Sequence, residues 1–560
     1  MKIKLNNILS LVLIGLLVGC TNGFEEINKN PNASLIMTPD ALMNQSITAT
    51  RTLFGGRLNR EITVNYAHYY TPGGGEFQKY GYVQTQNDLN WHNFYLECIQ
   101  PTNSIVEQYG TNPAYKNRVN IAKIFQAYIY SQGVAIWGGM PKSQALNGTS
   151  TVAFDTEESI YTQLIAELKT SIAALDEKGD KFQLAAEPIY SSDIIKWKKF
   201  GNSLLLRLYV RLSDCATGAL ATDIQTHAAY LLNNPAELIS SNAEQAATRF
   251  GIYTDSWYDL YDVLVFNKAN LLAENTPVMC ETFMIYTKSY GDPRISIFAD
   301  TCLTGPFKGS YWGKPKAAAN KPKFMPTGGA PSIHASRTAT DYSSIGAEFL
   351  RPDAEYVYLG YPEVCFLKAE LALKTWGGKA DADAQAAYEA GIDASMTKLN
   401  ANTAAAATYK IRAGVLWGTQ TAMDTIGRQK DFYDWMPFSS SLIEGNVPSD
   451  VKLKQIIMQE WIALFPNGLD AWTLHRRTQL LDLPPHFGPA NTALTYGLGY
   501  TFIPNRVLYP TNEYQTNGAA VATAVTSLGG ADNMDTKLWF AKPQKKTFTS
   551  SGLYPTYPFK

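Results

Sequence analysis

Along most of its length, the chain repeats apolar residues every three or four positions, which is the spacing of one face of an α-helix. A stripe of this kind usually faces a protein core and rarely forms a ligand site. Four stripes are clear: Tyr161, Leu164, Leu168, Ile172 and Leu175; Ile194, Trp197, Leu204, Leu208 and Leu212; Ala384, Tyr388, Ile392, Met396 and Leu399; and Leu453, Ile456, Ile457, Trp461, Leu464 and Phe465. The pattern predicts a mainly α-helical chain, and an apolar content of 45% allows a large core.

Several of the predicted helices follow one another in pairs with short connections. The pairs are 93–110 with 115–136, 156–176 with 193–214, and 363–376 with 381–399. Neighbouring helices of this length are typical of tetratricopeptide-like repeats, in which each pair buries its apolar face against the next. We therefore expect a scaffold of stacked helix pairs.

The local sequence also predicts where three helices begin. Thr38-Pro39-Asp40 places a proline in the first turn of a helix, where its missing N–H costs nothing. Asp155 and Glu158 have the spacing of a capping box. Ser192-Asp193 precedes the second stripe and supplies side-chain oxygens that can cap a helix.

Three long stretches lack helical periodicity and are rich in Gly, Pro, Tyr and Asn. They span residues 66–90, 250–350 and 478–560. Long loops without regular structure are uncommon in compact domains and usually have a function. We predict a helical scaffold that carries long irregular ligand-binding loops and few short strands.

The first 19 residues have the pattern of a secretory signal. Lys2 and Lys4 precede an apolar run from Ile8 to Val18, which is too short to remain in a bilayer as a spanning helix. Leu17-Val18-Gly19-Cys20 resembles a bacterial lipobox, in which the Cys20 thiol is diacylated and the chain is cut before it. The alternative is an ordinary signal in which a cysteine happens to stand at this position.

If Cys20 is lipidated, several acyl chains would anchor the protein stably, because each buried CH₂ contributes about 0.8 kcal/mol. We predict a signal peptide at 1–19, a lipidated tether at 20–37 and a single helical domain at 38–560. The acidic pair Glu25-Glu26 resembles the surface-export signals of Bacteroidetes lipoproteins, although a solvated linker would have the same composition.

Charge and motifs exclude several classes of function. The formal net charge is −1 and no Lys/Arg cluster is present, which argues against nucleic-acid binding. The chain has no H-E-x-x-H, G-x-S-x-G, P-loop or G-x-G-x-x-G motif. We expect no enzyme activity, no cofactor and no metal, although two carboxylates brought together in space, as in a glycosidase, leave no mark in the sequence.

The cysteines give no sign of a zinc or thiol-redox site, because their spacing is wide and no C-x-x-C occurs. Cys280 and Cys302 are the closest pair and could form a disulfide. Two buried thiols are the interpretation that we favour, since free cysteine is among the most buried residue types.

Blocks along nearly the whole chain resemble one protein family. They are Ala135-Ile136-Trp137-Gly138-Gly139-Met140-Pro141; Trp197-x-x-Phe200-x-Asn202-x-Leu204-x-x-Arg207; Tyr361-Pro362-Glu363-x-x-Phe366-x-x-Ala369-Glu370; Gln459-Glu460-Trp461 through Asp470-Ala471-Trp472 to Arg476-Arg477; and Ile503-Pro504-x-Arg506-x-x-Tyr509-Pro510-x-x-Glu513. With Asn28-x-Asn30-Pro31-Asn32 near the lipobox, they resemble the SusD/RagB family of outer-membrane lipoproteins, and in particular its SusD-like branch, common in Bacteroidetes.

This resemblance implies a tetratricopeptide-containing fold and a lid that closes over a SusC-like, TonB-dependent β-barrel in the outer membrane. The lid would deliver captured nutrient to that transporter from the cell surface. The quoted blocks would be scaffold, so we expect partly buried arginines bonded to carboxylates and carbonyls at Arg207, Arg211, Arg476 and Arg477.

Two positions depart from the family pattern. The segment Trp137-Gly138-Gly139-Met140 lacks an acidic residue often found there, and Glu460 replaces a frequent Lys. We expect both departures to change local packing and not the role of the protein.

An oligosaccharide would stack its sugar rings on exposed aromatic side chains, so we look for aromatics in loops. Two groups are the predicted ligand contacts: Tyr69, Tyr70, Tyr80 and Tyr82 around Gly73–Gly75, and Tyr311 and Trp312 beside Phe307. A third group is Trp257, Tyr258 and Tyr261, whereas Trp91 and Tyr95 are assigned to the core. Each loop aromatic could instead pack its own loop, and some family members capture peptides, for which backbone hydrogen bonds matter more.

Overall fold

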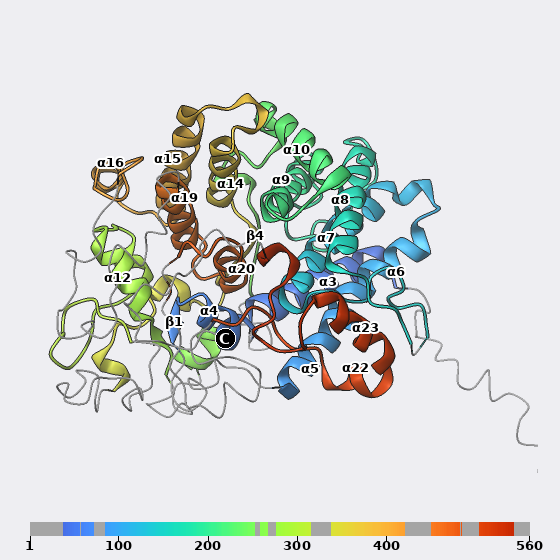
Figure 1. Ribbon diagram of the computed structural model, residues 1–560, viewed down its shortest axis with the longest axis horizontal. Coiled ribbons are helices and arrows are strands. Elements are labelled where there is room, and N and C mark those ends of the chain that lie inside the picture. The colour runs from blue at the N-terminus through green and yellow to red at the C-terminus, as the bar shows by residue number, and fades with distance from the viewer. Residues whose placement is uncertain are drawn as a thin grey trace, which may run out of the picture.

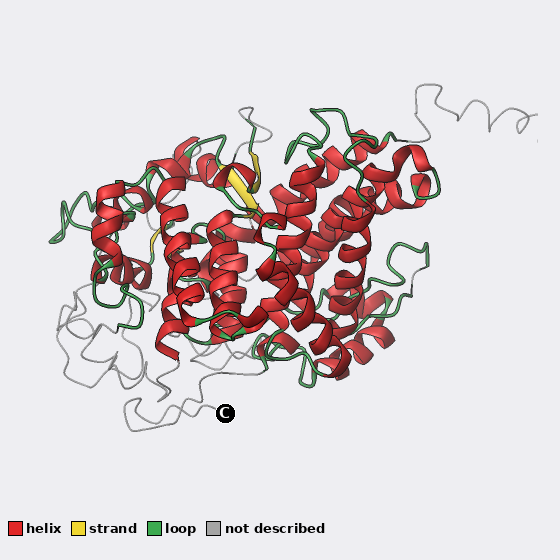
Figure 2. Cartoon of the chain, turned by 90° about the horizontal axis from the view of Figure 1, so that it is seen from above, coloured by secondary structure: helices red, strands yellow, loops and turns green. Residues whose placement is uncertain are grey.

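A computed structural model of the chain describes residues 37–56, 58–71, 84–149, 151–251, 258–266, 276–314, 338–419, 450–481, 483 and 503–542. Within these residues the protein is mainly α-helical with short strands, which confirms the predicted fold class (Figure 2). The predicted signal, Cys20 and the tether up to residue 36 lie outside the described residues, as do Tyr80, Tyr82 and Trp257.

Helices that follow one another in the chain pack side by side, as Figure 1 shows. The predicted pairs are present with ends close to those expected, except that the helical stretch predicted to start at residue 93 starts at Gln84 and includes a π-helical segment before α6. They are α6 (Gln100–Tyr109) with α7 (Lys116–Trp137), α8 (Glu157–Ala174) with α9 (Ile194–Leu212), and α14 (Tyr361–Leu373) with α15 (Asp381–Lys398). The tetratricopeptide-like arrangement predicted from the sequence is therefore confirmed.

The remaining helices extend this scaffold. They are α3 (Pro39–Gly55), α4 (Val64–Tyr66), α5 (Gln84–Asn93), α10 (Gly218–Asn233), α11 (Asp259–Tyr261), α12 (Glu281–Ser289), α13 (Ile295–Phe298), α16 (Thr403–Lys410), α19 (Asp450–Ala463), α20 (Gly468–Thr478), α22 (Thr511–Thr516) and α23 (Gly518–Leu528). Short π-helical segments occupy Asn59–Thr63, Phe94–Ile99 and Asp262–Phe266, and short 3₁₀ turns include Asn242–Glu244, Ala347–Leu350 and Trp539–Ala541.

Two of the predicted helix starts are confirmed. The backbone N–H of Ala41 donates to Thr38 Oγ1 at 3.2 Å, and that of Lys196 donates to Asp193 Oδ1 at 3.2 Å. Each side chain satisfies an N–H that has no partner within its own helix.

The predicted capping box at Asp155 is wrong. Thr156 caps α8 instead, and its Oγ1 accepts the N–H of Ser159 at 3.2 Å. The carboxylate of Asp155 turns the other way and accepts the backbone N–H groups of Lys142 at 2.9 Å and Ser143 at 2.8 Å. The carboxylate of Asp155 therefore stabilises the turn after α7 and does not cap α8.

Two small antiparallel sheets connect distant parts of the chain. β1 (Tyr70–Thr71) pairs with β3 (Val278–Met279), and β2 (Ala246–Arg249) pairs with β4 (Glu355–Leu359). Because β4 leads into α14 after Gly360, it fixes the start of that helix beside the sheet. The predicted irregular stretch 250–350 is wrong in its centre, where β3, α12 and α13 bury apolar side chains in the core. The other two predicted irregular stretches are also wrong in part, because 66–90 ends within α5 and 478–560 contains α22 and α23.

The C-terminal part of the described chain crosses the end of α7. The N–H of Val507 donates to Ile136 O at 2.9 Å, and Arg506 Nη2 donates to Trp137 O at 2.9 Å. Gly138 has a φ of 90°, and a Cβ there would lie 2.9 Å from a methyl carbon of Leu538. This crossing therefore requires glycine at position 138, a packing role in agreement with the prediction for this segment.

The core is rich in aromatic rings. Trp461 is fully buried, and its Nε1–H donates to Ala67 O at 2.9 Å. Trp91 lies on α5 and Tyr95 on the π-helical segment that follows it, and their ring centroids are 5.2 Å apart. Both assignments to the core are confirmed.

None of the five cysteines in the described residues forms a disulfide, and Cys280 and Cys302 are both buried. The favoured interpretation of two buried thiols is therefore confirmed. Among the described residues, no helix combines the length and apolar character needed to cross a membrane.

Candidate functional site

The structure places Tyr69 and Tyr70 in the core. Both are 0% exposed. The Tyr69 ring stacks on Trp461 with centroids 5.6 Å apart, and its hydroxyl donates to the Trp461 carbonyl. In this conformation neither ring offers a face to solvent, and Tyr80 and Tyr82 lie outside the described residues.

Trp312 is buried against its own loop, with only 9% of its surface exposed. Its ring centroid lies 3.8 Å from that of Phe307 and 5.4 Å from that of Tyr342. In this conformation the indole does not face solvent, and Gly313 allows the backbone of the loop to approach Glu281 closely. Tyr311, one residue earlier, is half-buried. Ligand contact by either residue stays a prediction.

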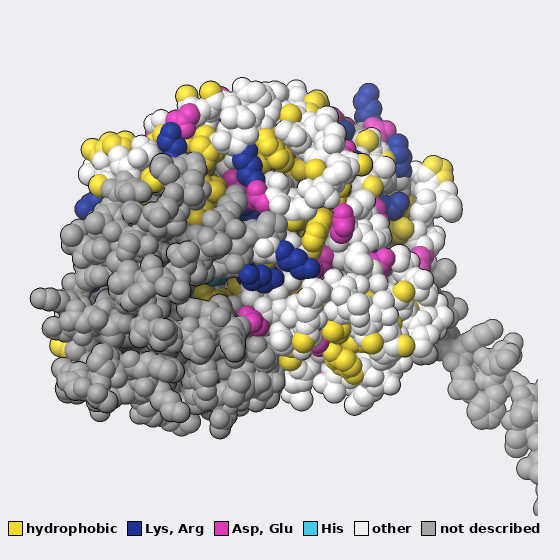
Figure 3. Space-filling model, viewed as in Figure 1, with side chains coloured by type: hydrophobic (Ala, Val, Ile, Leu, Met, Phe, Trp, Pro, Cys, Tyr) yellow, Lys and Arg dark blue, Asp and Glu magenta, His cyan; other side chains and the backbone are white. Residues whose placement is uncertain are grey.

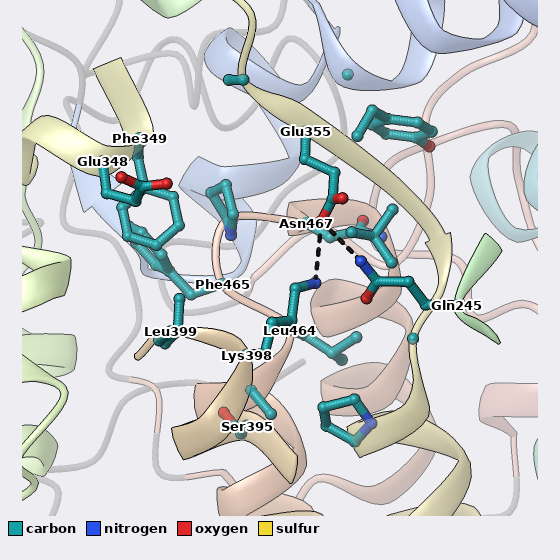
Figure 4. Close-up of a pocket in the computed structure, with 18 of the residues that line it drawn as sticks. Gln245, Glu348, Phe349, Glu355, Ser395, Lys398, Leu399, Leu464, Phe465 and Asn467 are labelled. Carbon is teal, nitrogen blue, oxygen red and sulfur yellow. Dashed lines mark hydrogen bonds and ion pairs between the residues drawn. The ribbon is translucent and has the colours of Figure 1, made fainter. Parts of the chain in front are cut away.

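A cavity of about 400 Å³ lies where β4, the end of α15 and the turn between α19 and α20 meet (Figure 4). This volume is within the range of about 300–1,000 Å³ typical of small-molecule sites. Glu355 begins β4, Lys398 ends α15, and Gln245 directly precedes β2. Tyr258, from the third group of loop aromatics, lines this cavity, whereas none of the residues in the two groups predicted to contact the ligand does.

Gln245, Glu355 and Lys398 form the polar wall of the cavity. Gln245 Nε2 donates to Glu355 Oε2 at 2.9 Å, and Lys398 Nζ lies 3.7 Å from the same oxygen. Figure 4 shows the three side chains converging on this point. Burial lowers the pKa of Lys398, and the nearby Glu355 carboxylate opposes that shift.

Phe349, Phe465 and Leu399 form the apolar wall on the other side of the cavity in Figure 4. The rings of Phe349 and Phe465 meet edge to face, with centroids 4.8 Å apart. Apart from Tyr258, sequence reasoning missed the residues of this cavity, because they come from separate elements and no spacing along the chain brings them together.

The predicted buried arginines are confirmed. Arg207 donates to both carboxylate oxygens of Glu363, at 2.6 and 2.7 Å. Arg477 forms the same two-bond pair with Glu370, at 2.7 Å for each bond. Arg211 Nη1 donates to Ser131 O at 2.8 Å.

Arg476 is satisfied differently, by carbonyls and an aromatic ring. Its Nη1 donates to Asn505 O at 2.8 Å, and its guanidinium carbon lies 3.4 Å from the centroid of Trp472. Burial, together with the charge of Arg211, lowers the pKa of Arg476 well below its usual value. These contacts join α20 to the C-terminal segment.

Glu460 lies within this buried charged cluster. It lines a small cavity of about 30 Å³ together with Arg207, Arg211 and Arg477, and its Oε2 has no hydrogen-bond partner. Burial, reinforced by the nearby Glu363 carboxylate, raises the pKa of Glu460 well above its usual value. The replacement of a frequent Lys by Glu460 therefore changes the electrostatics of the core.

On the face shown in Figure 3, Lys, Arg, Asp and Glu side chains are interspersed over the described residues. No large area of one sign is visible there, in agreement with the near-neutral net charge. Within the described ranges, no group of three or more His, Cys, Asp and Glu side chains is arranged to hold a metal ion.

Comparison with solved structures supports the fold. A chitin-binding SusD homologue from Flavobacterium johnsoniae is 24% identical, with a TM-score of 0.69 over 90% of this chain and 97% of that chain. A SusD homologue from Bacteroides vulgatus is 20% identical, with a TM-score of 0.70 over 91% of this chain and 99% of that one. A structure described as a chitin-binding protein is 19% identical, with a TM-score of 0.70 over 90% of this chain and 100% of that chain.

A search of curated protein sequences found no significant match. The sequence model of the SusD-like family, described as "starch-binding associating with outer membrane", matches residues 31–510. This match spans most of the chain and includes both the helix pairs and the buried arginine cluster. The chain therefore belongs to the SusD-like family.

Proposed function

We propose that this protein is a cell-surface lipoprotein that captures oligosaccharide and delivers it to a SusC-like, TonB-dependent transporter in the outer membrane. The observation that carries the proposal is the family match over residues 31–510, whose description names starch binding and association with the outer membrane. Two of the similar structures are described as chitin-binding. Fragments of chitin and starch are therefore the first ligands to test.

The attachment to the membrane would come from lipidation of Cys20, which follows the predicted signal peptide. Acyl chains on this residue would leave the helical domain on the outside of the membrane, joined by the tether at 20–37. Tyr311 and Trp312 are the described residues that we propose to contact the oligosaccharide.

The protein would bind its ligand without cleaving it. A transport lid needs reversible binding, and the sequence contains none of the catalytic motifs sought above. The proposal therefore predicts that incubation with glycans releases no products.

Purification from native membranes in mild detergent tests the partnership. We expect a large β-barrel transporter to copurify, and since the net charge is near zero, the contact should tolerate added salt better than a charge-driven one. Recovery of the protein as a lone monomer, at low as well as moderate salt, would contradict the transport role.

A further inference from the structure

We propose that the cavity between β4, the end of α15 and the α19–α20 turn is a second binding site, which takes one neutral, hydroxyl-rich ring such as a monosaccharide. The site is separate from the contacts proposed above, because neither Tyr311 nor Trp312 lines it. Its volume of about 400 Å³ suits a small molecule and not a long chain.

Two buried amide oxygens in the cavity wall have no hydrogen-bond partner, Oε1 of Gln245 and Oδ1 of Asn242. The orientation of both amides is fixed by chemistry. Gln245 Nε2 donates to the Glu355 carboxylate at 2.9 Å, and Asn242 Nδ2 donates to the carbonyl of Ala394 at 2.9 Å. Because carboxylates and carbonyls only accept, the amide nitrogens must face them and the oxygens must face away.

Buried polar atoms in native proteins are normally hydrogen-bonded. The two unpaired acceptors belong to residues that line one cavity, but both oxygens are closed off from it in this conformation. An occupant whose hydroxyl groups donate to Gln245 and Asn242 would satisfy these oxygens after a small movement of the two side chains.

The charges that line the cavity are already paired. Lys398 lies 3.7 Å from Glu355, and Glu363 accepts from Arg207 at 2.6 Å. The other charged residues of the lining form a group at its edge, in which Arg351 lies 3.1 Å from Asp353 and 3.6 Å from Glu348, and Arg249 lies 3.8 Å from Asp353. A charged ligand would have to break one of these pairs or remain partly desolvated without a partner, which is costly. The occupant is therefore neutral.

The opposite wall is apolar and partly flat. Phe349, Phe465 and Leu399 face the polar wall formed by Gln245, Glu355 and Lys398 (Figure 4). A sugar ring has an apolar face of C–H groups and an edge of hydroxyls, so it matches both walls at once. A purely apolar ligand would leave the two amide oxygens without donors.

Saturation-transfer NMR with the purified protein and glucose at millimolar concentration tests the proposal. We expect transfer to glucose, and at least tenfold weaker binding of glucuronate and glucosamine, which have a similar ring but carry a charge. Binding of either charged analogue as tight as that of glucose would overturn the assignment of a neutral ligand.

Thr397→Trp is the blocking variant, because Thr397 is an exposed residue of α15 that lines the cavity. Ala386→Trp is its matched control, since Ala386 is exposed on the same helix and does not line the cavity. We expect Thr397→Trp to reduce the glucose signal at least tenfold and Ala386→Trp to leave it unchanged. Gln245→Met, which removes the unpaired acceptor at similar side-chain length, should also weaken binding about tenfold.

Thermal melting of each variant verifies that the fold is retained. No transfer to glucose in the wild-type protein, or equal transfer in the wild type and Thr397→Trp, would overturn the proposal and leave the cavity filled by water alone. The outcome is independent of the proposed function, because oligosaccharide binding by Thr397→Trp can be measured separately and is expected to persist.

Discussion

Glu460 is a carboxyl group buried among arginines that already have acidic partners. Arg207 is bonded to Glu363 and Arg477 to Glu370, while Glu460 Oε2 has no partner. Burial raises the pKa of Glu460 well above its ordinary value of 4.5. The folded protein thus binds this proton more tightly than the unfolded chain does, so the free energy of unfolding falls as pH rises above 4.5 toward the raised pKa.

Glu460→Gln keeps the shape of the neutral acid and cannot ionise. We expect the free energy of unfolding of the variant, measured relative to that of wild type, to rise by at least about 1 kcal/mol when the pH is raised from 5 to 8. The reason is that one unit of pKa shift corresponds to about 1.4 kcal/mol. Urea unfolding at both pH values measures the difference. Glu158→Gln, at an exposed position of α8, is the control. If the stability difference between wild type and Glu460→Gln is the same at pH 5 and pH 8, the pKa of Glu460 is not raised in the folded protein.

Trp312 and Trp461 differ in what surrounds them, although both are buried. Trp461→Ala should cost about 3–5 kcal/mol, because it opens a cavity among the rings of Tyr69, Phe283 and Tyr286. Trp312→Ala removes a ring from a small separate cluster and should cost about 1–3 kcal/mol.

Trp312→Ala also tests the proposed contact between Trp312 and the oligosaccharide. If Trp312 stacks on sugar after a local movement of its loop, Trp312→Ala should lower oligosaccharide affinity about tenfold to a hundredfold. Calorimetry with a ligand that the wild type binds gives the affinity, and thermal melting gives the stability. Unchanged affinity would remove Trp312 from the site and leave Tyr311 as the described candidate.

At the scale of single residues, periodic positions could be predicted and loop positions could not. Trp461 belongs to an apolar stripe, and its burial follows from that spacing. Tyr69 has no such neighbours in sequence, because it lies just before a two-residue strand whose partner, β3, is distant in the chain. Its burial depends on α12 and α19, which sequence spacing does not place beside it.

Helices α14 and α20 are joined by the pair between Glu370 and Arg477. Both bonds are 2.7 Å long and both side chains are almost fully buried. Arg477→Met should cost about 3–5 kcal/mol, because it leaves Glu370 buried without its cation. Denaturant unfolding measures the loss.

Replacing both partners is the sharper test of that explanation. Arg477→Met combined with Glu370→Met removes the uncompensated charge, so the double variant should recover part of the lost stability. Lys169→Met breaks an exposed pair with Asp223 and should cost no more than about 1 kcal/mol. A double variant less stable than Arg477→Met would contradict the charge argument.

At the scale of elements, helix pairs followed from the sequence because amphipathic spacing and short connections are local properties. Two of three helix starts were also predictable from caps. The third predicted start, at Asp155, is wrong because the carboxylate of Asp155 accepts hydrogen bonds from the turn at Lys142 and Ser143. These residues are 13 and 12 positions away in the chain, so the contact does not follow from local spacing. The cavity beside Gln245 is lined by residues from several separate elements. Its position could not be predicted from the sequence, because these contacts are also non-local.

At the scale of the whole molecule, the proposed location depends on one residue. Cys20→Ala should abolish lipidation and release the protein from the outer membrane, since the acyl chains would supply nearly all of its membrane affinity. Membrane fractionation with immunoblotting measures this directly. Normal retention of the variant in the outer membrane would show that the lipobox assignment is wrong.

Isothermal titration calorimetry of the purified protein is the most direct test of oligosaccharide capture. The ligands are chitin-derived and starch-derived oligosaccharides, with peptides of similar length as the comparison, and the products are then analysed for cleavage. The account predicts saturable binding of at least one oligosaccharide class, recovered intact, and no binding of the peptides. Saturable peptide binding without sugar binding, or release of shorter sugars, would contradict it.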